Sequence, residues 1–288
     1  MYLDLVDVFA TGSLTGNPLA VVRSGEALDG AAMQKLTRWL GFSETAFLLP
    51  PQDPAADYRV RIFYPAGELP FAGHPTLGSA HAWLGAGGVP RRQGRIMQEC
   101  GIGLVEIRQE DGLLGFMAPP LRRSEALDAA DLEEAVRLTG VEPAVVVAAV
   151  HADNGPGWKL LHLASAHDVL SAESAARGKV PTDVALLGPY LSGEGGQARW
   201  EVRAFFADAN GRLCEDPVTG SLNAAVAQYL FAAGLEHDQY FAAQGRMVGA
   251  SGMVCCSRDS QGQIWVKGLV RTVSSGGVLT LPGSVVCG

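Results

Sequence analysis

An internal repeat links the two halves of the chain and constrains the fold more than any other feature. Residues 60–64 read VRIFY and residues 202–206 read VRAFF, at an offset of 142. A polar turn and then a run of small residues follow each segment, AGHPTLGSAHAWLGAG from Ala72 and TGSLNAAVAQYLFAAG from Thr219, at an offset of 147. A duplicated unit generally packs against its own copy. The repeat therefore predicts two similar halves with a small-molecule site in the seam between them.

The two offsets differ by five residues, so we expect a longer loop in the second copy, carrying the polar run 214–217. The offset also decides which side chain faces His74 across the seam. An offset of 142 brings Asp216 opposite His74, whereas an offset of 147 brings Ser221 there. We favour 147, because the two helical segments align better in that register.

The length of 288 residues allows two domains of about 140 residues each, and the repeat selects that division. We place the first domain at 1–118, with 276–288 returning to it, and the second at 119–275. The segment Ala118-Pro119-Pro120 interrupts regular secondary structure and marks the point where the chain crosses from the first domain to the second. Apolar residues make up 48% and charged residues 18% of the chain, which excludes a disordered protein.

Charge and hydropathy narrow the class of partner and the compartment. The formal net charge of -8 argues against nucleic acid or an anionic membrane as partner, since both require clustered Lys and Arg. The start MYLDLVDVF predicts a strand and not a signal peptide, and no run approaches the roughly 20 apolar residues of a membrane span. We expect a cytoplasmic protein. The five cysteines, at 100, 214, 255, 256 and 287, lack metal-site spacing and are expected to be reduced and buried.

Alternating apolar and polar residues predict strands in both halves. The predicted strands span 3–9, 20–23, 45–49, 58–64, 104–109, 114–117, 145–150, 158–163, 201–206, 252–257, 263–268, 270–273 and 278–281. The predicted helices span 30–40, 75–84, 132–138, 165–176 and 221–233. The segments 75–84 and 221–233 are almost wholly small or apolar, which is typical of a helix enclosed by a sheet.

Two helix beginnings are candidate anion sites. Gly73-His74 and Gly220-Ser221 each open a predicted helix, and free backbone N–H groups at such an end bind carboxylates or phosphates. If the halves pack about a pseudo-two-fold axis, both ends point at one cleft. The alternative is that His74 and Ser221 only cap their helices.

Two carboxylates are candidates for acid/base chemistry. Glu44 lies at the entry to an apolar strand, where burial raises the pKa of a carboxyl group towards the neutrality that proton transfer needs. An exposed Glu at a strand edge is the alternative. Asp216 precedes Pro217, and an isolated Asp-Pro is usually a turn initiator. The spacing alone does not choose between these alternatives.

Metal and cofactor motifs are absent from the sequence. The remaining histidines have no ligand-like spacing, the glycine-rich stretch at 101–103 lacks the rest of a dinucleotide signature, and no Gly-x-Ser-x-Gly elbow occurs. Chemistry without a cofactor or metal is therefore expected.

Five segments together resemble the PhzF-like phenazine biosynthesis isomerase family. These segments are GNPLAVV at Gly16, FSETAF at Phe42, ELPFAGHPTLGSAHAWL at Glu68, EDPVTGSLNA at Glu215 and QGxxxG at Gln244. The match is collinear over nearly the whole chain. The resemblance implies an α+β protein of the diaminopimelate-epimerase type, with two pseudo-symmetric domains that each wrap a barrel-like sheet around a central helix.

The resemblance also implies roles for individual residues. Glu44 corresponds to the acid/base carboxylate of the family, and His74, Asp216 and Ser221 correspond to its polar companions. The backbone N–H groups of Gly73 and Gly220 would hold a substrate carboxylate.

Two departures limit what is carried over from related enzymes. Related racemases place a cysteine at each helix end, where this chain has Ala72 and Thr219, so a two-thiol racemase is excluded. The family often has Arg directly after QGxxxG, and this chain has Ala250. Recognition of the substrate near that loop is accordingly expected to differ.

The sequence thus predicts a cofactor-independent isomerase that moves a proton within a small carboxylated substrate, a cyclic or unsaturated amino or hydroxy acid. The resembled activity is that of trans-2,3-dihydro-3-hydroxyanthranilate isomerase. A homodimer and a cleft that closes over its ligand are expected with it. The alternatives are a non-catalytic carboxylate-binding or partner-binding protein on the same fold, and an isomerase or epimerase of another amino-acid derivative.

Overall fold

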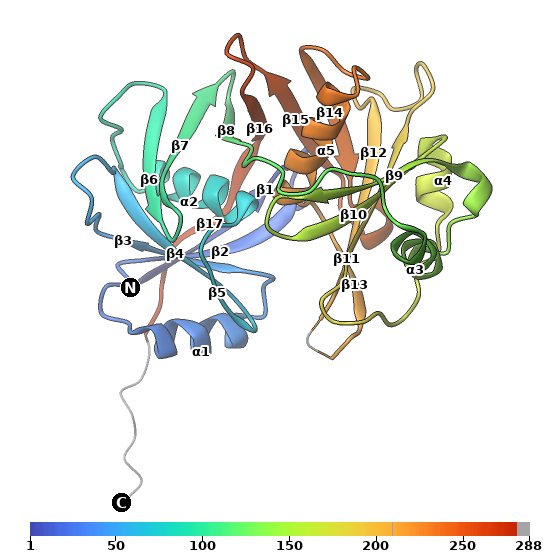
Figure 1. Cartoon of the computed structure of the whole chain (residues 1–288). Coiled ribbons are helices and arrows are strands. Elements are labelled where there is room, and N and C mark those ends of the chain that lie inside the picture. Colours follow the sequence, from blue (N-terminus) through green and yellow to red (C-terminus); the bar gives the residue numbers. More distant parts are fainter. Residues whose placement is uncertain (209, 281–288) are drawn as a thin grey trace, which may run out of the picture.

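Two similar lobes lie side by side in the computed structural model, which describes residues 1–208 and 210–280. Each lobe encloses one helix, α2 (Gly73–Gly85) in the first and α5 (Gly220–Ala232) in the second (Figure 1). Both helices have 13 residues and are related by the offset of 147 at both ends, which confirms the favoured helix register. The expected strand end at Leu281, Cys287 and the rest of 281–288 lie outside the described residues.

The strands follow the same order in both halves. The first half contains β1 (Tyr2–Val8), β2 (Asn17–Arg23), β3 (Thr45–Leu49), β4 (Tyr58–Tyr64), β5 (Gly67–Leu69), β6 (Arg95–Cys100), β7 (Gly103–Glu110) and β8 (Leu113–Met117). The second half contains β9 (Val146–Asp153), β10 (Gly157–Leu163), β11 (Asp183–Pro189), β12 (Trp200–Ala207), β13 (Leu213–Asp216), β14 (Gln239–Gln244), β15 (Gly252–Arg258), β16 (Ile264–Gly268) and β17 (Val270–Val278).

Hydrogen bonds join all of these strands into one sheet of 17 strands over the described residues. The sheet runs from β17 through β1, β2, β3, β4, β6 and β7 to β8, and β8 pairs with β16 across the two halves. It continues through β15, β14, β12, β11 and β10 to β9. The mixed α+β fold with a sheet around a central helix in each half is confirmed, but the sheet does not close into barrels.

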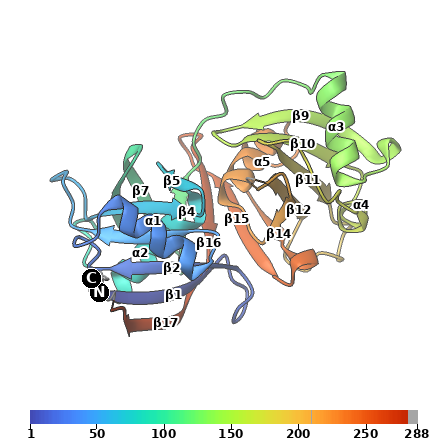
Figure 2. The same cartoon turned by 90° about the horizontal axis from the view of Figure 1, so that it is seen from below.

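Strand β17 returns the chain to the first half. It pairs with β1 from Val270 opposite Val8 to Val278 opposite Tyr2, and Figure 2 shows it at the outer side of β1. The return therefore begins before residue 276, where we expected it. The division into domains at 118 and 275 stays a prediction.

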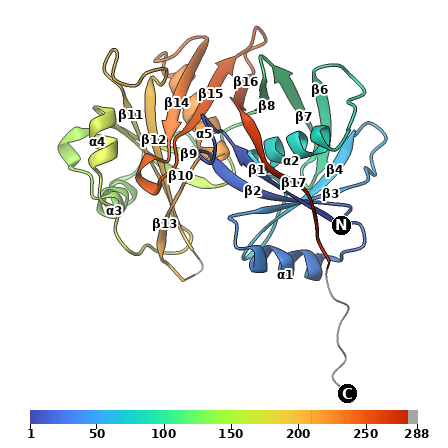
Figure 3. The ribbon, with the colours of Figure 1, turned by 180° about the vertical axis from the view of Figure 1, so that it is seen from behind.

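The three outer helices carry side-chain caps, whereas the two central helices do not. Asp29 caps α1 (Gly30–Leu40), Asp128 caps α3 (Ala129–Thr139) and Ser165 caps α4 (Ala166–Ser171), each by accepting a bond from a backbone N–H of the first turn. Figure 3 shows these helices outside the lobes. The N-cap residues of α2 and α5 make no side-chain cap bond within the described part of the chain. The central helices therefore begin with open N–H groups.

Several elements differ from the sequence predictions. Strands β5, β6, β11, β13 and β14 were not expected, and helix α4 ends at Ser171 and not at Ala176. The expected loop at 214–217 is wrong in part, because Cys214 to Asp216 belong to β13 and pair with β12. The extra length of the second copy lies largely in the turn between β12 and β13 instead.

Each half contains an equivalent Arg–Glu ion pair that stabilises the strand before its central helix. In the first half, the Arg61 guanidinium donates to both Glu68 carboxylate oxygens at 2.7 and 2.6 Å. In the second half, Arg203 binds Glu215 in the same way at 3.0 and 2.8 Å, but this pair is almost fully buried. The ion pairs fix the two hairpins that lead into α2 and α5.

Two further expectations can be compared with the structure. No helix in residues 1–208 and 210–280 is long and apolar enough to span a membrane. Cys100, Cys214, Cys255 and Cys256 are free thiols, of which the last two are buried and the first two only half-buried.

Candidate active site

The N-terminal ends of α2 and α5 meet in the seam between the lobes. A Cβ atom added to Gly220 would lie 3.1 Å from Gly73 Cα and 3.3 Å from His74 N, so the two backbones are in close contact. The N-cap residues are Ala72 and Thr219, and neither side chain caps its helix. The alternative that His74 and Ser221 serve as caps is therefore wrong. Two open helix ends with their positive dipole ends make this part of the seam locally electropositive, which favours an anion there.

Glu44 and His74 face each other at this seam. Glu44 Oε2 lies 3.6 Å from His74 Nε2, and neither atom has a hydrogen-bond partner among the described residues. Glu44 directly precedes the buried strand β3, and its side chain is only 19% exposed. Buried polar groups normally have partners, so two unpaired atoms that face each other indicate a place for a ligand.

Burial sets the protonation of both groups. Burial, assisted by the negative charge of Asp216, raises the pKa of Glu44 from 4.5 to about 8. Burial lowers the pKa of His74 from 6.5 to about 3, so its imidazole is neutral throughout the physiological range. The contact between Glu44 and His74 is consequently not an ion pair, although its distance is within the range of one. The buried-acid alternative for Glu44 is the one that fits the structure.

Asp216 ends strand β13 and is held by two donors. Asn17 Nδ2 donates to Asp216 Oδ1 at 3.1 Å, and Thr219 Oγ1 donates to Asp216 Oδ2 at 2.5 Å. Burial raises the pKa of Asp216 to about 6, and these two hydrogen bonds oppose that rise. Asp216 is thus more than the turn initiator that an Asp-Pro pair suggests, because its carboxylate is bonded across the seam to Asn17.

Gln244 and Asn223 complete a polar network behind Asp216. Gln244 Oε1 accepts from the backbone N–H of Thr219 at 3.1 Å and from Asn223 Nδ2 at 2.9 Å. Gln244 Nε2 donates to Thr219 Oγ1 at 2.9 Å. Sequence reasoning quoted Asn17 and Gln244 only as letters of motifs and gave them no role. Their membership in GNPLAVV and QGxxxG was the available signal.

Ser221 lies in the first turn of α5, on the side of the second lobe. Its hydroxyl accepts from Trp158 Nε1 at 3.4 Å, and its carbonyl accepts from Asn154 Nδ2 at 2.7 Å. The structure therefore places Glu44 in direct contact with His74, and the charge of Asp216 acts on Glu44. Ser221 lies at the seam because it belongs to the first turn of α5. Cys214 lies on β13 with its Sγ beside the Arg212 carbonyl, so the structure does not place this thiol at the start of α5.

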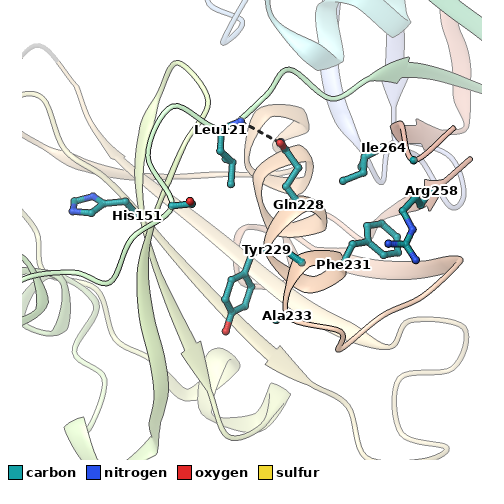
Figure 4. A pocket seen from close by; sticks show the side chains of 11 residues that line it. Leu121, His151, Gln228, Tyr229, Phe231, Ala233, Arg258 and Ile264 are labelled. Atoms are coloured by element: carbon teal, nitrogen blue, oxygen red, sulfur yellow. Dashed lines mark hydrogen bonds between the residues drawn. The ribbon is translucent and has the colours of Figure 1, made fainter.

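Two cavities lie apart from this group of residues. One, of about 590 Å³, lies over the C-terminal half of α5 (Figure 4). Two of its polar side chains have partners: Gln228 accepts from the Leu121 N–H, and the Tyr229 hydroxyl bonds to His162. The other, of about 470 Å³, is lined by Thr11, by Ala250 and by neighbouring residues of the segment from β14 to β15.

The sequence model of the PhzC-PhzF family, described as phenazine biosynthesis-like protein, matches residues 6–276. "Antisense-enhancing sequence 1" of Schizosaccharomyces pombe is 34% identical over 239 residues, 78% of each chain. The trans-2,3-dihydro-3-hydroxyanthranilate isomerase of Pseudomonas fluorescens is 33% identical over 232 residues, also 78% of each chain.

Solved structures show the same fold. The Bacillus anthracis phenazine biosynthesis protein of the PhzF family superposes with a TM-score of 0.81 at 20% identity, over 97% of this chain and 99% of that one. A probable proline racemase from Agrobacterium radiobacter, solved with bound carbonate, gives a TM-score of 0.57 at 15% identity, over 97% and 93% of the two chains.

Proposed function

Because the chain belongs to the PhzC-PhzF family of phenazine biosynthesis-like proteins and is an isomerase, we propose that it moves a proton within a small carboxylated acid. In its ionised form, which becomes populated as the pH approaches its pKa of about 8, Glu44 removes a proton from one carbon of the substrate and returns it to another carbon on the same face. A single group with a pKa near the working pH serves both steps well.

The observation that carries this proposal is the pair of unpaired atoms, Glu44 Oε2 and His74 Nε2, beside two open helix ends. The N–H groups at Gly73 and Gly220 hold the substrate carboxylate, which places the rest of the molecule against Glu44. Neutral His74 and the Asp216 carboxylate orient the polar groups of the substrate, while Ser221 adds a hydroxyl at the second helix end. Preorganised polar groups of this kind stabilise charge that develops during the reaction.

The proposed substrate class is a cyclic or unsaturated amino or hydroxy acid. The relative from Pseudomonas fluorescens is named for trans-2,3-dihydro-3-hydroxyanthranilate, which makes this compound the first substrate to test. The reaction as proposed uses only side chains of the chain itself. Closure of the seam over the substrate would keep water from competing for the proton on Glu44. Closure, a homodimeric assembly and a cytoplasmic location stay predictions.

Isotope exchange tests the proposal. Wild-type protein should isomerise trans-2,3-dihydro-3-hydroxyanthranilate in D₂O, measured by ¹H NMR, and turnovers in which Glu44 exchanges its proton with solvent should place deuterium in the substrate or product, measured by mass spectrometry. The variant Glu44→Gln keeps the shape of the side chain but cannot carry the proton, so we expect incorporation to fall at least about 100-fold, as is usual for loss of an acid/base group.

The matched control is Glu68→Gln, which changes a half-exposed Glu of the first hairpin outside the seam. It should retain the parent rate. Exchange at the parent rate in Glu44→Gln would exclude Glu44 as the proton carrier. Binding of several small carboxylates by the wild type without any isotope incorporation would favour the non-catalytic alternative.

A further inference from the structure

In the polar network behind Asp216, backbone groups determine which side-chain atoms donate hydrogen bonds and which accept them. A backbone N–H can only donate and a backbone carbonyl can only accept. Gln244 bonds to one of each: its Oε1 accepts from the Thr219 N–H at 3.1 Å, and its Nε2 donates to the Asp216 carbonyl at 3.2 Å. These two bonds fix which end of the Gln244 amide is the donor.

The Thr219 hydroxyl lies between Gln244 and Asp216, so the donor end of the Gln244 amide determines where the hydroxyl proton points. Gln244 Nε2 donates to Thr219 Oγ1 at 2.9 Å, so this oxygen acts as an acceptor towards Gln244. The hydroxyl proton of Thr219 is then free to point only at its other neighbour, Asp216 Oδ2, at 2.5 Å. Asp216 Oδ2 is therefore an acceptor and carries no proton of its own.

The other carboxylate oxygen, Asp216 Oδ1, also accepts from a donor whose identity a backbone group determines, and this donor belongs to the first lobe. Asn17 Nδ2 donates to the Val218 carbonyl at 2.9 Å, which identifies this atom as the amide nitrogen. The same nitrogen donates to Asp216 Oδ1 at 3.1 Å. Both carboxylate oxygens consequently face donors whose direction is set by the backbone, and Asn17, Gln244 and Thr219 are all buried.

We propose that Gln244 and Asn17 are positioning residues that hold Asp216 in its ionised form, with Thr219 relaying the direction of the Gln244 amide to the carboxylate. A carboxylate that accepts hydrogen bonds is stabilised in its charged state. The fixed negative charge of Asp216 in turn disfavours a second charge on the neighbouring Glu44. Of the two carboxyl groups in the ligand-free site, Glu44 therefore holds a proton and Asp216 does not, and Glu44 has to release that proton before it can accept one from the substrate.

The other charged groups around the site leave this order of protonation intact. His74, which faces Glu44, is neutral because burial lowers its pKa to about 3. Glu215, next to Asp216, raises the pKa of Asp216, but it is paired with Arg203 at 2.8 Å. The proposal rests on the proposed function, because it concerns the protonation of the carboxyl group that is proposed to carry the substrate's proton.

Carboxyl titrations in the ligand-free protein test the proposal without any substrate. Side-chain carboxyl groups are labelled with ¹³C and followed by NMR between pH 4 and 10, with Glu44→Gln and Asp216→Asn used to assign the signals. In the wild type, Asp216 should ionise at a lower pH than Glu44. The order in the folded wild type is a test that needs no stable variant, and the reverse order would overturn the proposal.

The variant Thr219→Val removes the relaying hydroxyl and keeps the shape of the side chain. We expect the titration of Asp216 to move up by about one pH unit, the effect of losing one hydrogen bond to a carboxylate, and that of Glu44 to move down. Thr219→Ser should restore both titrations. The control Thr139→Val, another buried threonine whose hydroxyl bonds only within α3, should change neither.

Unchanged titrations in Thr219→Val would overturn the relay. This outcome is distinct from failure of the proposed function, because the titrations use no substrate. A wild type that shows the expected order of ionisation but exchanges no isotope would retain the relay and refute the isomerase chemistry proposed for Glu44.

Discussion

Glu44 binds its proton more tightly in the folded protein than in the unfolded chain, and this makes stability depend on pH. Its pKa rises from 4.5 to about 8 on folding, so between these values the native state binds more protons than the unfolded state. A group of this kind contributes stability that is complete below pH 4.5 and is lost as pH rises through about 8.

The variant Glu44→Gln removes this dependence. Relative to the wild type, its free energy of unfolding should rise by about 3–4 kcal/mol between pH 5 and pH 8. Urea denaturation at the two pH values measures the difference, with Glu68→Gln as the variant that should track the wild type. If the free energy of unfolding changed by the same amount between the two pH values in Glu44→Gln and in the wild type, the pKa of Glu44 would not be raised by folding.

The sequence pointed to the two carboxylates of the proposed site but not to their environment. The resemblance pointed to Glu44 and Asp216 by number, whereas the residues alone left each with an exposed or turn-forming alternative. The deciding contacts come from distant segments: Asn17 lies 199 residues before its partner Asp216. No local pattern reports such a contact, and this is also why Asn17 and Gln244 received no role from the sequence.

At the scale of elements, local signals predicted the helices and missed several strands. Helix α1 was placed with correct bounds, because its apolar face and the cap pair Asp29 and Gly41 are all encoded within 13 consecutive residues. Strands β6, β11 and β14 were missed. Their sequences, RIMQEC, DVALLGP and QYFAAQ, alternate weakly, and their pairing partners lie elsewhere in the chain. The repeat was therefore a better guide to the architecture than strand patterns were.

The repeated hairpin ion pairs should differ strongly in their effect on stability. Arg203 is almost fully buried, and besides Glu215 it donates to the carbonyls of Val169 and Ala172. Arg203→Met would leave a buried carboxylate and two carbonyls without partners, which we expect to cost about 3–5 kcal/mol. Arg61 and Glu68 are 32% and 40% exposed, so Arg61→Met should cost no more than about 1 kcal/mol.

Urea denaturation of the two variants measures this contrast within one fold. The comparison is internal, because both arginines bind a Glu on the next strand with the same bidentate geometry. Equal losses in the two variants would mean that burial of the second pair does not govern its contribution. Such a result would also weaken the view that this pair fixes the approach of β13 to the site.

At the scale of the whole molecule, the pseudo-two-fold relation between the lobes brings the residues of the proposed site together. The seam is built from equivalent elements that meet each other: β8 pairs with β16, and the start of α2 contacts the start of α5. Neither helix end alone would surround a substrate. The repeat in the sequence predicted this meeting, but it did not predict that the strands of both halves would join into one open sheet.

The close approach of the two helix ends requires glycine at both positions, and this gives the last prediction. In Gly220→Ala the new Cβ would lie 3.1 Å from Gly73 Cα, tighter than ordinary van der Waals contact, so the two helix ends must separate by a few tenths of an ångström. We expect a loss of about 1–3 kcal/mol in the free energy of unfolding. Binding of anthranilate, a small aromatic carboxylate, should weaken as the two sets of N–H groups move apart.

Gly85→Ala is the matched control, because it adds the same methyl group at the far end of α2. A Cβ at Gly85 meets no atom within 4 Å, so this variant should be neutral or more stable by up to about 1 kcal/mol. Titration of anthranilate followed by ¹⁵N chemical shifts compares affinities across the two variants. Wild-type affinity in Gly220→Ala would mean that carboxylates bind elsewhere, since a site made from both helix ends cannot tolerate their separation without losing contacts to the anion.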